Sequence, residues 1–290
     1  MPIHLSIIEE RRTPTQANTT FHIRPARWST PFNRLRHRAA LTACLCLLGT
    51  PWFCWSQGPT PAPLPPLPTN HQVRQLEGWK VRIDERLLGG NEEGVGARGL
   101  RLLTARLVTI EAIVPPTALA KLRALPIQID LTHGRLRNMQ YHPSAEWLTN
   151  HGYSAALEKW VHIPDVQYFL SPFENHRQPA AVLHELAHAF HDQVLGFDEP
   201  RIRAAWKKFR DSGRYGSVLT SPGGKREHYG LTNQKEFFAE MTETYLAMND
   251  FFPFVAGELQ HEEPEIFQLM SEIWGPLPGR RPAPDAAQTP

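Results

Sequence analysis

The chain has 290 residues, 41% of them hydrophobic and 21% charged, which is the composition of an ordinary globular protein. Its formal net charge is +2, but residues 1–58 hold seven arginines against two glutamates, so the rest of the chain is net negative. Because no basic block lies in that remainder, we expect no nucleic-acid partner. All three cysteines also lie in residues 1–58 (Cys44, Cys46 and Cys54), so the remainder has no disulfide and no thiolate that could bind a metal.

The first 58 residues have the features of an export signal. Arginines precede the apolar run AALTACLCLL at residues 39–48, which is short compared with the roughly 20 apolar residues of a membrane span. We therefore expect a basic N-terminus with a signal peptide over residues 1–58, and a secreted, periplasmic or extracellular protein. A membrane anchor over residues 39–55 and a plain buried helix remain the alternatives.

Proline-rich sequence predicts an extended linker over residues 59–75, and residues 276–290 have the composition of a disordered tail. One domain, residues 76–275, lies between them. Its first half alternates between strand-like and helix-like periodicity. In chain order, the expected elements are a strand at 79–88, helices at 99–114 and 118–125, a strand at 126–131, an irregular or partly helical stretch at 138–159, and an extended edge strand at 161–170.

The second half of the domain is predicted to be mostly helical. Pro179 suits a first helical turn, Gly196 suits the residue beyond a helix end, and Thr232 or Asn233 can cap a later helix. The expected elements are helices at 179–195, 199–210, 234–248 and 263–273, with a long glycine-containing loop at 211–233. A small N-terminal sheet followed by helices predicts an α+β fold.

The segment AAVLHELAHAFHDQ, residues 180–193, places ionisable side chains in an apolar helix. His184 and His188 are four residues apart, so both point to the same side and can offer imidazole nitrogens to one ion. Glu185 is offset by one residue and can contact a metal-bound water without ligating the metal. This is the His-Glu-x-x-His arrangement of zinc hydrolases.

A catalytic zinc needs a third protein ligand. His191 lies a further turn along a straight helix, where it closes a tetrahedron poorly, so we expect it to make a structural hydrogen bond. In NQKEFFAEMTETYL, Glu236 and Glu240 are four residues apart beside aromatic residues, so one can ligate zinc while the other accepts the free N–H of a zinc-binding histidine. A solvated acidic face is the alternative interpretation, and it suits Glu243 best.

The two motifs together, HELAH and then EFFAE about fifty positions later, resemble those of the gluzincin zinc peptidases and, more narrowly, of the anthrax lethal factor catalytic-domain-like family. The resemblance covers about residues 179–248 and implies a zincin-like metallopeptidase fold that binds Zn²⁺. By this resemblance Glu236 is the third zinc ligand, which leaves Glu240 to orient a histidine. Tyr229, seven residues before Glu236, would face the open coordination position.

These residues predict a hydrolytic mechanism. With Zn²⁺ held by the two motif histidines and Glu236, Glu185 would act as general base on a zinc-bound water and then protonate the departing amine. Tyr229 would donate a hydrogen bond to the oxyanion, with His228 as the competing donor. A peptide substrate could add as a strand along residues 161–170. We therefore expect an exported zinc endopeptidase. A non-catalytic extracellular binding domain stabilised by zinc, and an amidase acting on cell-wall material, are the alternatives.

Overall fold

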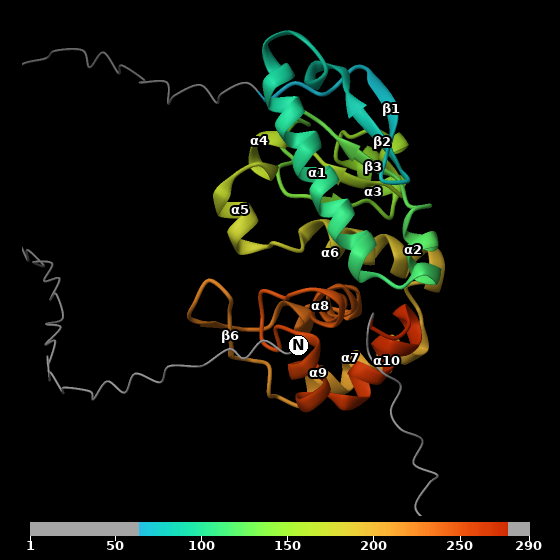
Figure 1. The fold of residues 1–290 in the computed structure, drawn as a ribbon, viewed down its shortest axis with the longest axis vertical. Coiled ribbons are helices and arrows are strands. Elements are labelled where there is room, and N and C mark those ends of the chain that lie inside the picture. The colour runs from blue at the N-terminus through green and yellow to red at the C-terminus, as the bar shows by residue number, and fades with distance from the viewer. Residues whose placement is uncertain (1–63, 278–290) are drawn as a thin grey trace, which may run out of the picture. The chain divides into compact units, whose positions relative to one another are not determined.

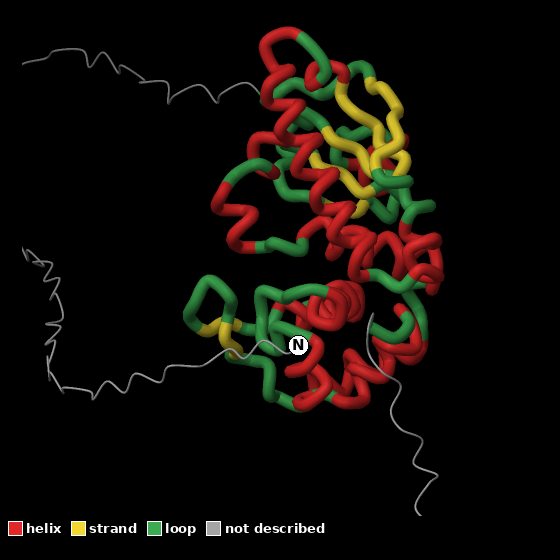
Figure 2. The backbone as a smooth tube through the Cα atoms, viewed as in Figure 1, coloured by secondary structure: helices red, strands yellow, loops and turns green. Residues whose placement is uncertain are grey.

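The computed structural model describes residues 64–277, which form a mixed α and β structure (Figure 1). A small sheet and several helices come first in the chain, and a mostly helical part follows (Figure 2). This confirms the predicted α+β class. The predicted signal peptide, the alternative anchor and most of the predicted tail lie outside the described residues. Within residues 64–277, no helix has the length and apolar character needed to span a bilayer.

The sheet has five strands in the order β1-β2-β3-β5-β4. They are β1 (His71–Leu76), β2 (Trp79–Asp84), β3 (Ile127–Ile129), β5 (Val161–Ile163) and β4 (Gln140–Tyr141). The three central strands are parallel, and β1 and β4 pair antiparallel at the two edges. Arg82, Gln128 and His162 are in register on adjacent strands, and each is flanked by aliphatic residues. Because side chains alternate along a strand, one face of the sheet is polar in its centre and the other is apolar.

Helices α1 (Glu93–Ile113) and α6 (Ala181–Phe190) share one hydrophobic core with the aliphatic residues of the sheet. Helix α2 (Pro116–Leu122) connects α1 to β3. Gly99 allows α1 to lie close to its neighbours, because a Cβ atom there would be 2.4 Å from Cγ2 of Val166 and 3.6 Å from Cδ1 of Ile129. Helix α1 begins six residues before the predicted start, in a glycine-containing stretch whose periodicity is weak.

Two expectations about strands are wrong. Strand β1 lies in the last part of the predicted linker, where no strand was expected. Its hydrophobic alternation is weak because four of its six side chains are exposed. The predicted edge strand at 161–170 is a strand only over β5, which lies inside the sheet between β3 and β4. The chain then turns into a short helix, α4 (Val166–Phe169), because the Asp165 side chain caps it by accepting a hydrogen bond from the backbone N–H of Tyr168 at 2.9 Å. The edge strand on this side is therefore β4.

The remaining elements of residues 64–277 are helices, helical turns and a hairpin. The other α-helices are α3 (Ala145–Asn150), α5 (Pro172–Arg177), α7 (Pro200–Asp211), α8 (Gln234–Leu246), α9 (Ala256–Glu262) and α10 (Pro264–Trp274). Short helical turns are η1 (Glu85–Leu87), η2 (Gly90–Glu92), η3 (Ala155–Leu157), η4 (His191–Leu195) and η5 (Tyr229–Leu231). The predicted loop at 211–233 contains η5 and a two-stranded hairpin of β6 (Val218–Leu219) and β7 (Lys225–Arg226).

Helix α8 is the centre of the helical part. The Asn233 side chain accepts hydrogen bonds from two backbone N–H groups of its first turn, as predicted for the cap. Every residue from 237 to 246 is buried. Helix α8 packs along α6 (Figure 1). The Trp274 ring contacts Phe190 of α6 and Phe238 of α8. This packing brings the two sequence motifs side by side.

Candidate metal centre

Helix α6 carries the first half of the candidate centre. Its apolar side chains are buried in the core, and His184 and His188, four residues apart, lie toward helix α8. After Phe190 the helix widens into the π-helical turn η4, and it ends at Gly196, whose φ of 84° is in the left-handed region. The predicted helix end at Gly196 is thus confirmed, although the last turn is not α-helical.

Helix α8 supplies the carboxylate. Oε2 of Glu236 lies 3.3 Å from Nε2 of His184 and 3.2 Å from Nε2 of His188, and the two Nε2 atoms lie 3.1 Å apart. Ligands at about 2.0–2.1 Å from a tetrahedral zinc are separated from one another by roughly 3.3 Å. The three donor atoms therefore have the mutual spacing of zinc ligands, and these are the three residues predicted from the sequence.

The electrostatic surroundings of these donors favour a cation. Burial alone would lower the pKa of His184, but Glu236 and Glu243 outweigh it and raise that pKa well above its ordinary value. Burial would likewise raise the pKa of Glu236, but His184 and His188 hold it well below its ordinary value. Positive charge is stabilised at this position, whether it comes from a proton or from a metal ion.

Glu185 is held by the edge of the sheet. Its Oε2 accepts a hydrogen bond from the backbone N–H of Tyr141, in strand β4, at 2.7 Å. Burial raises the pKa of the Glu185 carboxyl, and the neighbouring histidines oppose this only in part. The strand contact was not predicted, because nothing in the sequence links residue 141 to residue 185.

The partner of His184 differs from the expectation. Oε1 of Glu243 lies 2.5 Å from Nδ1 of His184, whereas the nearest oxygen of Glu240 lies 3.8 Å from that nitrogen. Glu243 is 1% exposed, so its prediction as a solvated carboxylate is wrong. Residues 236, 240 and 243 share one face of α8, and the seven-residue spacing from 236 to 243 was the missed signal. Glu243 is placed to hold the His184 ring, and Glu240 lies behind it without a direct hydrogen bond.

His191 and His228 do not take the places expected for them. Both are fully buried, and neither ring nitrogen of His191 has a hydrogen-bond partner within the described residues, so the predicted structural hydrogen bond is absent there. His191 instead packs its ring against Phe197 and Phe238, and burial lowers its pKa to about 4. Nδ1 of His228 accepts from the backbone N–H of Gly230, and aromatic rings enclose the side chain, so it is not exposed to the cleft.

The centre opens into a cleft of about 890 Å³. His184, Glu185, His188 and Glu236 all line it, and so does Tyr229, which is 44% exposed. Burial, with Glu236 as the next cause, raises the pKa of Tyr229, so its hydroxyl keeps its proton. The structure therefore brings together on one cleft the base, the donors and the tyrosine that the sequence predicted as a group.

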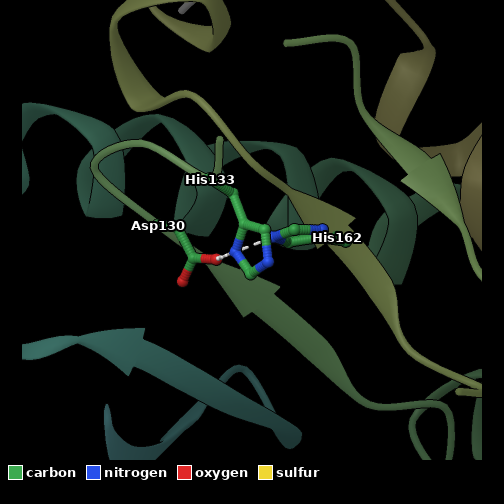
Figure 3. Close-up of side chains that lie close together, drawn as sticks. All are labelled: Asp130, His133 and His162. Atoms are coloured by element: carbon green, nitrogen blue, oxygen red, sulfur yellow. Dashed lines mark hydrogen bonds and ion pairs between the residues drawn. The ribbon is translucent and has the colours of Figure 1, made fainter. Parts of the chain in front are cut away.

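A second cluster of histidines and a carboxylate lies at the end of the parallel strands. Oδ2 of Asp130 lies 2.7 Å from both Nδ1 of His133 and Nε2 of His162, whose rings converge on it (Figure 3). The Gln128 amide donates to the same oxygen at 2.7 Å, and Nε2 of His71 lies 2.8 Å from Oδ1. Burial would raise the pKa of Asp130, but these histidine contacts hold it well below its ordinary value.

The spacing in the second cluster is that of hydrogen bonds. Charge-assisted N–H···O bonds have donor–acceptor distances of about 2.7–2.9 Å, whereas two ligands of one zinc lie roughly 3.3 Å apart. Asp130 and His162 are fully buried, and the nearest histidine beyond them, His142, contacts Nδ1 of His162 at 3.1 Å. We therefore describe this cluster as a buried hydrogen-bond network around one carboxylate. No sequence motif pointed to it, since its residues come from separate segments.

Comparisons with protein-family models, with curated proteins and with solved structures found no match to the chain. The likeness to the gluzincins therefore depends on the motif residues, and it remains a prediction.

Proposed function

We propose that the chain is an exported zinc-dependent endopeptidase with a zincin-like fold. The observation that supports this most strongly is the spacing of 3.1–3.3 Å among the donor atoms of His184, His188 and Glu236. The Glu185 carboxylate lines the same cleft and is not one of these three donors. When bound, zinc supplies a Lewis acid that lowers the pKa of a water molecule and polarises a carbonyl oxygen. Export is proposed from residues 1–58 alone.

Glu185 acts as the general base of this proposed reaction. Its carboxylate lines the cleft next to the donors, and its raised pKa brings it closer to the operating pH, where a base both accepts and releases a proton. It takes the proton of the attacking water and passes it to the departing amine nitrogen. The backbone N–H of Tyr141 fixes the position of the carboxylate during both transfers.

The oxyanion and the substrate backbone are held by Tyr229 and strand β4. The Tyr229 hydroxyl donates to the developing oxyanion from the open side of the centre. The backbone N–H and C=O of His142, the residue after β4, bond to Trp160 and Lys159 on the β5 side, so those of Tyr141 point the other way, toward the cleft. The Tyr141 N–H donates to Glu185 there, and the Tyr141 C=O can accept from the backbone of an extended peptide. Substrate pairing is therefore proposed at β4 in place of residues 161–170.

Metal analysis combined with peptide hydrolysis tests this function. Wild type is expected to bind one zinc per chain, Glu236→Ala to lose it while remaining folded, and Glu185→Gln to keep it. Glu185→Gln should lower kcat by about 10²–10⁴-fold, because the loss of a general base has effects of that size. A Ser154→Ala variant, which removes the cap of η3 and does not line the cleft, is a control for general destabilisation.

Each outcome separates the alternatives. Zinc bound with no hydrolysis of any substrate would favour a zinc-stabilised binding domain. Turnover of peptidoglycan but not of a denatured protein mixture would favour a cell-wall amidase. Full activity in Glu185→Gln, or zinc retained in Glu236→Ala, would contradict the assigned roles of these residues.

A further inference from the structure

The walls of the cleft carry an excess of positive charge. Five cationic side chains line it, namely Arg135, Arg137, Arg177, Arg226 and Lys235. The carboxylates that line it are those of Glu185, Glu236 and Asp250. Because the chain outside residues 1–58 is net negative, this basic lining does not simply follow from the composition.

The cations come from both sides of the cleft. Arg135 and Arg137 lie in the segment between β3 and β4, and Arg177 ends α5, so all three belong to the sheet-containing part. Arg226 lies in β7 and Lys235 in the first turn of α8, in the helical part. A ligand that lies along the cleft therefore has positive charge on either side of it.

Three of these cations are already partly engaged. Arg177 pairs with Glu174 at 2.7 Å. Arg137 lies 3.7 Å from Asp165 and over the ring of Tyr168, and Lys235 lies over the ring of Phe197. These contacts fix the positions of the side chains.

Arg135 and Arg226 differ from the other three. Both are exposed, and neither has an ion pair or a side-chain hydrogen bond with any other residue in the 64–277 range. An arginine fork without a partner at the wall of a cleft is available to a carboxylate from outside the chain.

The reacting centre does not cancel this charge. With a divalent cation bound, the negative charges of Glu185 and Glu236 are balanced, and the two histidines are neutral ligands. Among the other lining residues that belong to the described range 64–277, Asp250 alone is acidic, against five cations. The part of the cleft that recognises a substrate is therefore strongly positive, and such a cleft attracts anions and raises their local concentration.

We propose that the cleft selects acidic peptides, with Asp or Glu residues near the scissile bond whose side chains bind Arg135 on one wall of the cleft and Arg226 on the other. This inference rests on the proposed peptidase function for the reaction, and on the charged lining for the choice of substrate. An acidic peptide is favoured over an anionic polysaccharide because the edge strand β4 lines the cleft and directs the C=O of Tyr141 toward it, where an extended peptide can pair.

Matched peptides test the preference. Three fluorogenic peptides share one scissile bond and differ only in carrying Glu, Gln or Lys at the flanking positions. The zinc-loaded full chain is expected to hydrolyse them with kcat/KM falling in the order Glu, Gln, Lys. Each exposed ion pair changes the rate by about 1.5- to 5-fold, so two pairs predict roughly a 2- to 20-fold preference for Glu over Gln. The preference should shrink in 1 M salt, where the screening length is about 3 Å.

Two double variants test whether the preference for acidic peptides depends on Arg135 and Arg226. Arg135→Gln with Arg226→Gln is expected to bring the Glu-to-Gln ratio of kcat/KM close to one. Arg98→Gln with Arg101→Gln, which removes two exposed arginines of α1 outside the cleft, should leave the ratio unchanged. An equal loss of the ratio in both double variants would overturn the assignment to the cleft arginines.

Binding separates this inference from the proposed reaction. Fluorescence anisotropy of the same peptides with zinc-loaded Glu185→Gln measures affinity without turnover, and the Glu peptide should bind most tightly. If no peptide is hydrolysed by wild type but the affinity order holds, the peptidase function fails and the acidic preference stands. If hydrolysis occurs without preference, or if the Lys peptide or an anionic polysaccharide binds more tightly than the Glu peptide, the acidic preference fails.

Discussion

Residues 64–277 hold two clusters of histidines and carboxylates that have similar residue types but different geometry. In the cluster of His184, His188 and Glu236, the donor atoms are 3.1–3.3 Å apart and open on a cleft. Around Asp130, the donor and acceptor atoms are 2.7–2.8 Å apart and buried. A proton lies between the two atoms of a short hydrogen bond, whereas the ligands of a metal surround it and stay further from one another.

The placement of protons explains the difference. Nδ1 of His184 faces Glu243, so a neutral ring has no proton on Nε2, and that nitrogen faces Nε2 of His188. A cation placed between these two nitrogens and Oε2 of Glu236 satisfies the lone pairs of all three atoms at once. Around Asp130 the histidines can each supply a proton to an ionised carboxylate, so the charges and hydrogen bonds are satisfied without an ion. A set of residue types therefore indicates a metal centre only when the distances among the donor atoms match those between the ligands of a metal ion.

Removing the Asp130 carboxylate should distinguish the roles of the two clusters most clearly. Asp130→Ala leaves several buried imidazole and amide donors without their acceptor, and we expect a loss of about 3–5 kcal/mol in the free energy of unfolding. For a domain of this size that lowers Tm by roughly 10 °C. The zinc content should remain that of wild type. Thermal unfolding and metal analysis of the same sample provide the measurement, and a loss of bound metal in this variant would show that the second cluster is a metal site.

A tyrosine lies beside each cluster, which allows a matched pair of variants. Tyr229→Phe removes a donor on the cleft side and should lower kcat about 10- to 100-fold, less than the largest effects of oxyanion donors because the hydroxyl is partly solvated. KM should change little, since the bond forms in the transition state. Tyr153→Phe, whose ring lies 5.8 Å from that of His133, should leave kcat unchanged. Equal effects of the two substitutions would argue against a role for Tyr229 at the oxyanion.

The carboxylates behind His184 offer a third comparison, now within one cluster. Glu243→Gln removes the charged acceptor of Nδ1 and should weaken zinc binding by about 10- to 100-fold. Glu240→Gln should change zinc binding much less, because the nearest oxygen of Glu240 lies 3.8 Å from Nδ1 of His184, and burial, followed by repulsion from Glu243, raises its pKa well above the ordinary value. Competition with a chromogenic chelator measures both affinities. A larger effect at Glu240 would restore the assignment first made from the sequence.

The sequence was sufficient for the parts of the fold that have strong periodicity or capping signals. The helix with the His-Glu-x-x-His motif, the later helix with its Asn233 cap and the strand β3 were all anticipated, because burial of one face imposes a regular pattern on the residues. Strands β1 and β4 were not, because the first is exposed on most side chains and the second has two residues. Such strands are specified by their partners in the sheet more than by their own residues.

The candidate site likewise has residues that the sequence predicted and contacts that it did not. His184, Glu185, His188 and Glu236 could be predicted because two of the proposed metal ligands are spaced by the pitch of one helix and the third lies in a recognisable motif. The burial of Glu243 and the contact between Tyr141 and Glu185 depend on how α6 packs against α8 and β4. Those contacts join segments more than forty residues apart, so no local pattern records them.

The pH dependence of stability gives the last comparison. In metal-free protein, His142 of the Asp130 network and His184 of the other cluster contribute to it with opposite signs. Burial, followed by repulsion from His162 and His133, lowers the pKa of His142 to about 3, below the value of about 6.5 in an unfolded chain. Between these values the unfolded chain binds a proton that the native state does not, so stability falls as the pH drops below 6.5. The raised pKa of His184 acts in the opposite direction, because its contribution is present below 6.5 and is lost as the pH rises through the folded value.

His142→Gln should therefore make the metal-free protein less sensitive to acid. From pH 6.5 to pH 5, one buried neutral histidine lowers the free energy of unfolding by about 2 kcal/mol, and the variant should lack this part of the decrease. The other buried histidines with lowered pKa values, His162, His191 and His228, are present in both proteins and cancel in the difference. Gln is chosen at position 142 because its amide can still hydrogen-bond to Nδ1 of His162. Denaturant unfolding of wild type and variant at pH 5 and pH 7, with a chelator present, measures it. Equal losses of stability in the two proteins on acidification would mean that His142 takes up a proton in the native state. Burial beside the Asp130 network would then not keep His142 neutral.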